Sequence, residues 1–246
     1  MRQFVPHVRA YFARDKTDRT IDYRVLVVEQ EPGLPFNAGL LRNAGFVIGA
    51  ADSEYTCFND VDYLPIWADY SWCDRPTPML WHGGETRPVA PGASDVVLKH
   101  DMERFFGGVL LVPNATFEKV NGYSNEYWGW GYEDHDVRER FVRNGIPLGR
   151  RRGTFLPLGH RNAGYELDGT PNAIGRVNEA LFQRKCAAGD GPRDGLSTNA
   201  FEVLDRQPIA DAPTPERTAV WERILVRPRL LPSPQQVAAL RPTAGP

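Results

Sequence analysis

Residues 55–65 read Tyr-Thr-Cys-Phe-Asn-Asp-Val-Asp-Tyr-Leu-Pro, a short apolar run that leads into two aspartates. The run from Tyr55 to Phe58 predicts a strand, and Asp60 and Asp62 follow its carboxyl end. Open α/β sheets bind ligands beyond that end of their strands. Carboxylates placed there suit Mg²⁺ or Mn²⁺, and such an ion can in turn hold a diphosphate. A plain turn explains the same residues, because Asp is a common turn former.

Strands and helices alternate on both sides of this segment. Strands are predicted at 23–30, 107–112 and 201–204, and helices at 36–50, 133–143 and from Thr170 to about Ala188. A further helix is expected to be capped by Asn114 and to end near Gly122. The alternation predicts an α/β fold with a mostly parallel central sheet. We expect one domain over residues 1–207, followed by a proline-rich tail over 208–246 that wraps the domain or stays partly mobile.

The composition is that of an ordinary soluble globular protein of 246 residues. Lys and Arg number 29 and Asp and Glu 31, so the net charge of −2 argues against a nucleic-acid binder with a basic face. No run approaches the ~18 apolar residues of a membrane-spanning helix, and the start at Met1 lacks a signal peptide. We therefore expect a cytoplasmic protein. Its three cysteines are too few for a disulfide scaffold and are typical of buried apolar positions.

A second group of polar residues is Tyr127–Asp136, which reads Tyr-Trp-Gly-Trp-Gly-Tyr-Glu-Asp-His-Asp. Aromatic faces that stack on a sugar, and carboxylates that accept its hydroxyl hydrogens, are what a carbohydrate site needs. One of these carboxylates can also serve as a general base for a hydroxyl nucleophile. The glycines on either side of Trp130 would let the loop hinge. The alternative is structural: the acids cap a helix N-terminus while the tryptophans fill the core.

Together these segments resemble the β-1,4-galactosyltransferase family, also called glycosyltransferase family 7. The resemblance covers roughly residues 23–205, with the motifs in unchanged order. Its most specific part is Tyr127–Asp136, which is similar to the family's YWGWGGEDDD and follows the aspartate pair. The other matches are Phe36–Phe46 with FNRAxLLNxGF, Tyr55–Pro65 with YTCFVFxDVDLLP, Phe106–Val109 with YFGGV, Val120–Asn125 with INGFPNN, and Asp194–Asp205 with SDGLxxLxYxVLD.

The resemblance implies a GT-A (Rossmann-like) fold and an inverting, metal-dependent transfer from a UDP-sugar to an acceptor hydroxyl. The sugar would be galactose or N-acetylgalactosamine, the acceptor a carbohydrate or glycoconjugate, and the metal Mn²⁺, with Mg²⁺ as the alternative. Asp134 would be the catalytic base. His160, by itself more often a structural residue, would join Asp62 as a metal ligand. The donor would contact Phe36, Asp60, Val61, Gly108, Trp130 and Glu133, and the acceptor Phe105, Trp130, Tyr132 and His135.

Two departures from the family concern the metal and the nucleotide. Pro157 or Leu158 stands where the family has a further metal ligand, so metal binding is expected to be weaker or to be completed by water. Ala38 replaces the arginine that follows Phe-Asn in the family. Arg42 or Arg9 would then compensate in contacting the nucleotide.

Two further departures concern the sugars. Phe105 replaces a tyrosine that the family ties to the choice between galactose and N-acetylgalactosamine. His135 replaces an acidic residue, which suggests an acceptor other than N-acetylglucosamine. Cys57 and Cys73 fall near the family's paired cysteines, but a reducing cytosol would prevent a disulfide. The family's membrane anchor is missing, so we expect a stand-alone enzyme.

Two other functions stay open on the sequence. A non-catalytic sugar-binding relative, or a subunit of a larger glycan synthase, would fit the lost metal ligand and Ala38. A metal-dependent phosphoesterase would use Asp60 and Asp62, but it leaves the tryptophan-glycine segment unexplained.

Overall fold

The computed structural model describes residues 2–14, 21–83, 85–86, 96–97, 105–158, 172–189, 193–209 and 220–240. Within these ranges the helices are α1 (Phe4–Arg14), α2 (Ala38–Gly49), α3 (Asn114–Lys119), α4 (Glu133–Arg143), α5 (Ala173–Ala188) and α6 (Pro234–Leu240), with 3₁₀ turns η1 (Ala50–Asp52) and η2 (Leu196–Thr198). The strands are β1 (Arg24–Gln30), β2 (Tyr55–Asn59), β3 (Tyr63–Trp67), β4 (Thr77–Pro78), β5 (Leu80–Gly83), β6 (Glu85–Thr86), β7 (Val96–Val97), β8 (Val109–Pro113), β9 (Gly153–Pro157), β10 (Phe201–Pro208) and β11 (Val220–Pro228).

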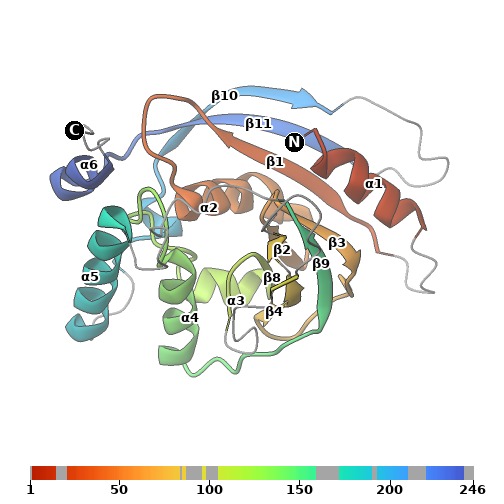
Figure 1. Cartoon of the computed structure of the whole chain (residues 1–246), viewed down its shortest axis with the longest axis horizontal. Helices are drawn as coiled ribbons and strands as arrows, with labels where there is room; N and C mark the ends of the chain where they lie inside the picture. The colour runs from red at the N-terminus through yellow and green to blue at the C-terminus, as the bar shows by residue number, and fades with distance from the viewer. Residues whose placement is uncertain are drawn as a thin grey trace.

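The sheet β1-β11-β10 crosses the top of Figure 1 and covers α2. β11 is its middle strand, parallel to β1 and antiparallel to β10. Ile224 and Val226 of β11 are fully buried against Leu40 and Leu41 of α2. The expected domain end at residue 207 therefore falls inside β10, and the chain expected to be a tail supplies the central strand of this sheet.

Antiparallel pairing dominates among the described strands, contrary to the expected mostly parallel sheet. Of the strand pairs in the described ranges, β1–β11 and β5–β9 run parallel, whereas β2–β8, β4–β8, β3–β9, β10–β11 and β6–β7 run antiparallel. A strand-helix-strand unit implies parallel neighbours only when both strands join the same sheet. Here α2 leads from β1 in the upper sheet to β2 in another, which is why the alternation misled the prediction.

The helix ends largely follow local signals. Asn37 caps α2 as its side chain accepts from the Leu40 backbone N–H at 2.9 Å. α4 occupies its predicted residues, and Gly189 ends α5 in the left-handed conformation, with φ of 66°. Asn114 differs from the prediction, because it is the first residue of α3 and not its cap. Its side-chain amide instead donates to the Ser53 carbonyl at 2.7 Å.

Aromatic packing brings the parts of the later site together. The Phe117 ring of α3 lies 4.8 Å from the Phe46 ring of α2 and 4.9 Å from the Phe58 ring of β2, centroid to centroid. α4 adds Val137 and Phe141, both fully buried in the same cluster. Burying each such side chain stabilises the fold by about 1.5–3 kcal/mol. The cluster therefore packs β2, β8 and α4 against one another.

Cys57 and Cys73, the pair that the resemblance brings together, are free cysteines of one core cluster. Burial raises the pKa of both thiols. Both therefore behave as small apolar residues, as the composition predicted.

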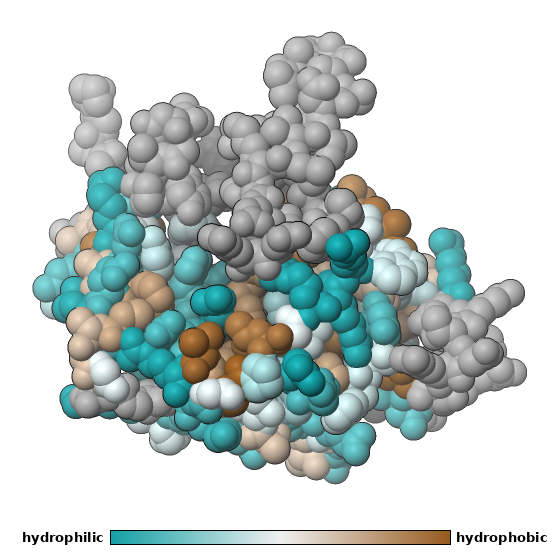
Figure 2. Space-filling model, turned by 90° about the horizontal axis from the view of Figure 1, so that it is seen from below, coloured by the Kyte–Doolittle hydropathy of each residue, from teal (hydrophilic) through white to brown (hydrophobic). Residues whose placement is uncertain are grey.

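The molecular surface is largely polar on the face that Figure 2 shows from below. Hydrophilic residues cover most of what is coloured there, and a small hydrophobic group lies near the centre. Over the part of the chain that the structure describes, none of the helices has the length and apolar character needed to cross a membrane.

Candidate functional site

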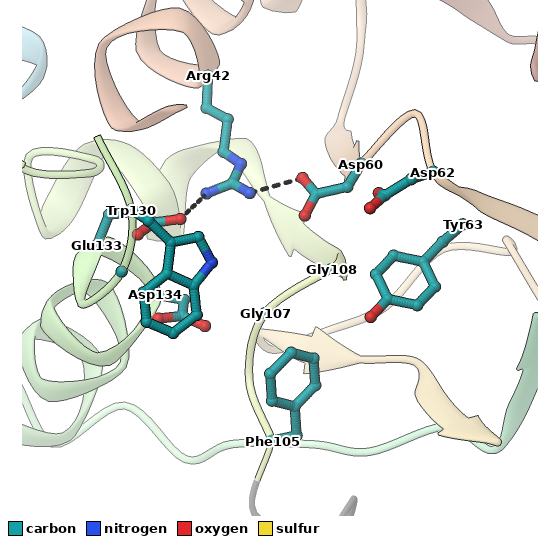
Figure 3. A pocket seen from close by; sticks show the side chains of 11 residues that line it. Arg42, Asp60, Asp62, Tyr63, Phe105, Gly107, Gly108, Trp130, Glu133 and Asp134 are labelled. Carbon is teal, nitrogen blue, oxygen red and sulfur yellow. Dashed lines mark hydrogen bonds and ion pairs between the residues drawn. The ribbon is translucent and has the colours of Figure 1, made fainter. Parts of the chain in front are cut away.

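A pocket of about 140 Å³ lies between α2, the turn after β2, the approach to β8 and the start of α4. It brings Asp62 and Asp134, some seventy positions apart in the chain, into one space. Figure 3 shows side chains from all four places around this space. The predicted site residues that line it are Asp60, Asp62, Phe105, Gly108, Trp130, Glu133 and Asp134.

A tight turn after β2 presents the two aspartates. The Asp60 backbone N–H donates to the Gly108 carbonyl at 2.8 Å, and the Tyr63 N–H donates to the Asp60 carbonyl at 3.1 Å. The Leu158 N–H donates to the Asp62 carbonyl at 2.6 Å. The backbone of the turn is thus held on both sides by neighbouring segments, while both carboxylates reach the pocket.

Two glycines let the approach to β8 pass close to the site. Gly108 has a φ of +77°, and a Cβ there would overlap the Leu80 side chain. A Cβ on Gly107 would overlap the Asp134 carboxylate and lie 3.1 Å from the Phe105 ring. Both positions therefore require glycine, because a larger side chain would overlap residues that form or support the pocket.

The aromatic segment before α4 divides its side chains between core and pocket. Trp128 is buried, with 1% of its surface exposed, whereas Trp130 lines the pocket. The buried side-chain amide of Asn178 donates to the carbonyls of both residues, at 3.1 and 2.9 Å. Between them, the Gly129 N–H donates to the Phe36 carbonyl at 2.7 Å. The structural and the functional interpretation of this segment therefore each apply to part of it.

Among the described residues that line the pocket, four carboxylates accompany one guanidinium. Arg42 Nη2 lies 2.6 Å from Asp60 Oδ1, and Arg42 Nη1 lies 3.2 Å from Glu133 Oε1. Burial disfavours the charge of Arg42, but these carboxylates outweigh it and raise the pKa of the guanidinium well above its usual value. Arg42 is the dominant positive charge of the pocket lining.

The adjacent carboxylates Glu133 and Asp134 have opposite pKa shifts. Burial disfavours the charge on Asp134, yet the hydrogen bond from His135 and the charges of His135 and Arg42 hold its pKa below the ordinary value. For Glu133, burial and repulsion by Asp134 raise the pKa despite Arg42. Asp134 is therefore ionised at neutral pH, as a general base must be. Glu133 keeps its proton to a higher pH than an ordinary glutamate does.

His135 contacts Asp134 from outside the pocket. Its Nδ1 lies 2.9 Å from Asp134 Oδ1, and this hydrogen bond raises the pKa of the imidazole. The ring packs against those of Tyr132, at 5.1 Å, and Phe182 of α5, at 6.0 Å. Tyr132 has a φ of +74°, a conformation that costs a non-glycine residue about 1–3 kcal/mol. Both residues were predicted to contact the acceptor. His135 borders Asp134 and Tyr132 packs on His135, but neither lines the pocket.

Two other predicted residues lie away from the pocket lining, and a third falls outside the residues that the structure describes. Phe36 is 57% exposed and Val61 is 46% exposed, and neither lines the pocket. His160 lies outside the described residues, so its predicted role as a metal ligand stays a prediction.

Of the two arginines expected to compensate for the one missing at Ala38, Arg42 lines the pocket, and its contact with a nucleotide stays a prediction. Ala38 and Arg42 are four residues apart on α2 and therefore lie on one face of the helix, one turn apart. Arg9, the other candidate, donates to the Ile209 carbonyl at 2.5 Å instead.

Tyr63 and Gly107, which also line the pocket, were given no site role from the sequence, and Gly131, a third lining residue, was expected only as a hinge of the loop. Adjacency is the signal that could have found them. Tyr63 directly follows the aspartate pair, Gly107 precedes Gly108, and Gly131 follows Trp130.

Asp60 and Asp62 offer the hard oxygen ligands that Mg²⁺ and Mn²⁺ prefer. Among the residues with described side chains, no group of three His, Cys, Asp or Glu is placed to hold a metal ion. Mg²⁺ in particular is often bound through one or two carboxylates, with water and substrate phosphate completing its shell. The donor set therefore fits a cation that arrives with a phosphorylated substrate.

Comparison with known families agrees with this site. Residues 2–72 match the family described as the N-terminal region of glycosyl transferase group 7, and residues 87–161 match the one described as the N-terminal domain of galactosyltransferase. The first match contains both aspartates of the turn, and the second contains Trp130, Glu133 and Asp134. The chain belongs to glycosyltransferase family 7. The resemblance drawn from the motifs is thereby confirmed.

Curated relatives of this family 7 chain are named for sugar transfer. β-1,4-Galactosyltransferase 4 of Rattus norvegicus is 28% identical over 204 residues, which cover 80% of this chain and 53% of the relative. β-1,4-Galactosyltransferase 1 of Homo sapiens is 31% identical over 194 residues, 76% and 44% of the two. A β-1,4-N-acetylglucosaminyl-transferase of Lymnaea stagnalis, which by its name acts on β-N-acetyl-D-glucosaminide, is 31% identical over 173 residues. These residues cover 66% of this chain and 34% of the relative. The chain spans about half the length of these relatives or less.

Solved structures show the same fold. The catalytic domain of Drosophila β-1,4-galactosyltransferase 7 with xylobiose has a TM-score of 0.64 and 22% identity, covering 93% of this chain and 88% of that one. A mutant of that protein with manganese, UDP-Gal and xylobiose gives a TM-score of 0.63. The expected α/β fold of GT-A type is therefore confirmed for this family 7 chain, although its described strand pairs are mostly antiparallel.

Proposed function

We propose that this protein is an inverting, metal-dependent glycosyltransferase. It moves galactose, N-acetylgalactosamine or a related hexose from a UDP-sugar to a hydroxyl of a carbohydrate or glycoconjugate. The observation that carries the proposal is that Asp62 and Asp134 line one pocket, together with Trp130. The names of the relatives support it, as does the Drosophila neighbour solved with manganese, UDP-Gal and xylobiose.

On the acceptor side, Asp134 takes up the proton of the attacking hydroxyl. The hydroxyl oxygen bonds to the anomeric carbon while the bond from that carbon to the diphosphate oxygen breaks, and UDP leaves. Attack from the face opposite the leaving group inverts the configuration. The lowered pKa of Asp134 keeps the carboxylate ready at neutral pH. A positioned base of this kind contributes typically ~10²–10⁴-fold to the rate.

On the donor side, Asp62 would hold Mn²⁺ or Mg²⁺, and Asp60 and Gly108 would contact the donor. The ion, when bound, supplies a Lewis acid that neutralises the charge of the departing diphosphate. Glu133, whose carboxylate lines the pocket, accepts hydrogen bonds from sugar hydroxyls. Trp130 covers the apolar face of the sugar.

Two residues set the choice of sugars in this proposal. Phe105 lines the pocket without the hydroxyl of the tyrosine it replaces, which leaves room for a 2-acetamido group on the donor. His135 borders Asp134 and favours an acceptor other than N-acetylglucosamine.

The test is UDP release from UDP-galactose and UDP-N-acetylgalactosamine with a panel of carbohydrate acceptors, run in parallel with Mn²⁺, with Mg²⁺ and with a chelator. We expect acceptor-dependent release that the chelator abolishes. Glycan binding without any UDP release would favour the non-catalytic sugar-binding alternative. Hydrolysis of phosphate esters without an acceptor would favour the phosphoesterase. The predicted cytoplasmic location stays a prediction, which fractionation of the source cells would check.

A further inference from the structure

Arg42 is a pocket residue for which the chemistry above gives no role. Its side chain is only 14% exposed, and its guanidinium lies 5.0 Å from the centre of the Tyr123 ring. The next residue, Asn43, anchors α2 to the same segment. Its side-chain amide donates to the Tyr123 carbonyl at 2.8 Å, and its Oδ1 accepts from the Tyr123 N–H at 3.0 Å. Arg42 therefore projects from a part of α2 that is held in place against the Tyr123 backbone.

The two groups that Arg42 holds come from opposite walls of the pocket. Asp60 stands after β2 and bonds Nη2 at 2.6 Å, whereas Glu133 stands in the first turn of α4 and bonds Nη1 at 3.2 Å (Figure 3). A planar guanidinium engages two carboxylates in a fixed geometry through separate nitrogens, which the point charge of an ammonium does not. One side chain from α2 thus connects two segments that are distant in sequence.

The charge of the pocket makes this connection important. Asp60, Asp62, Glu133 and Asp134 place four carboxylates around one space, and Arg42 is the one Lys or Arg among the described residues that line it. Buried carboxylates that lack a counter-charge repel one another and are costly. Arg42 offsets that repulsion at the point where the two walls meet.

We propose that Arg42 is a positioning residue for the transfer reaction. By bridging Asp60 and Glu133 it holds the turn after β2 against the first turn of α4, and Asp134 is thereby kept where it can reach the attacking acceptor hydroxyl. The inference rests on the proposed function but requires no contact between Arg42 and substrate. The charged groups around Asp134 that bear on its test are Glu133, His135 and Arg42, with Asp60 and Asp62 across the pocket.

The test compares the full chain with its Arg42→Leu and Arg42→Lys variants, measuring kcat and donor KM across pH. For Arg42→Leu we expect kcat to fall about 100-fold, because the base is displaced. The acid limb of the kcat profile should also move to higher pH, because a positive charge near Asp134 is lost. Arg42→Lys keeps the charge but engages one carboxylate, so we expect about tenfold lower kcat with an acid limb near that of the wild type.

Arg143→Leu is the matched control, since it removes an exposed arginine of α4 that pairs with Glu139 at 2.7 Å. It should leave both kcat and the acid limb unchanged. A double-mutant cycle of urea unfolding with Arg42→Leu and Glu133→Gln tests the bridge without turnover. We expect the two effects on the unfolding equilibrium constant to depart from independence by about threefold or more.

The proposal is overturned if the wild type transfers sugar and Arg42→Leu keeps its kcat and acid limb, or if the cycle shows independent effects. If the wild type transfers no sugar from any donor, it is the proposed function that fails. The unfolding cycle then still decides whether Arg42 and Glu133 are linked.

Discussion

At the scale of single residues, the surroundings of Asp134 decide how the pocket responds to pH. The carboxylate accepts from the His135 backbone N–H at 2.8 Å and lies 2.9 Å from His135 Nδ1. Because the pKa of Asp134 is lowered in the folded protein, its ionised form stabilises the fold at pH values above the ordinary pKa of an aspartate. This stabilisation is lost as the pH falls through the pKa that Asp134 has in the folded protein. The pKa of His135 is raised in the folded protein, so its effect has the opposite sign. The protonated imidazole stabilises the fold at pH values below the ordinary pKa of histidine, and this stabilisation is lost as the pH rises through the pKa of His135 in the folded protein.

Replacing His135 with Asn removes the imidazole and its charge from Asp134. We expect the pKa of Asp134 to rise, so that the acid limb of the transfer rate moves to higher pH. The measurement is kcat against pH. Glu139→Gln, a charge change one turn further along α4, is the control and should leave the limb in place. An acid limb of the kcat profile at the wild-type pH in His135→Asn contradicts this account of the base.

The space at Gly107 makes a second prediction at this scale. A Cβ there would overlap the Asp134 carboxylate, so we expect Gly107→Ala to lower kcat about 100-fold by displacing the base. Gly49→Ala is the control, because its Cβ would overlap Leu26, outside the pocket. Steady-state kinetics distinguish the two variants. Similar losses in both would show that the effect is general destabilisation.

At the scale of elements, local signals explain which parts were predictable. α4 was predicted with correct ends because its acids stand in the first turn and its bases later, which matches the helix dipole. β3 and β9 were not predicted, since each is short and its partner lies about ninety residues away in the chain. In the site, the sequence named Arg42 only as a substitute for the arginine missing at Ala38. Its partners are distant in the chain and come close to this apolar helix only in the folded pocket.

The cap of α2 is a test at this scale. Asn37 is fully buried, accepts from the Leu40 N–H and donates to the Asn125 carbonyl at 2.8 Å. We expect Asn37→Ala to lower the free energy of unfolding by about 2–3 kcal/mol, from the lost cap and an unpaired buried carbonyl. Asn172→Ala, at the half-buried cap of α5, should cost only about 1 kcal/mol. Urea unfolding gives both values, and equal losses would argue against the buried contact.

At the scale of the whole molecule, β11 joins the end of the chain to its beginning. The stretch from Pro208 to Pro246 is rich in proline and lacks a clear strand or helix pattern, so the sequence suggested a tail, whereas pairing with β1 and β10 makes β11 the middle strand of its sheet. No local signal carries that information, because the partner strand lies nearly two hundred residues away.

The place of β11 in the core can be measured. Ile224 is fully buried between the upper sheet and α2, so we expect Ile224→Ala to lower the free energy of unfolding by about 2–5 kcal/mol. Leu231, 77% exposed just beyond the strand, is the control, and Leu231→Ala should change stability by less than about 0.5 kcal/mol. A small loss at Ile224 would mean that this strand is peripheral to the core.

The central claim is that Asp62 and Asp134 serve one reaction from two sides of one pocket. The most direct measurement combines calorimetry of UDP binding in Mn²⁺ with sugar transfer, for the wild type, Asp62→Asn and Asp134→Asn. The account predicts that Asp134→Asn binds UDP as the wild type does while its transfer falls ~10²–10⁴-fold, whereas Asp62→Asn loses both. Transfer at the wild-type rate by Asp134→Asn would contradict it.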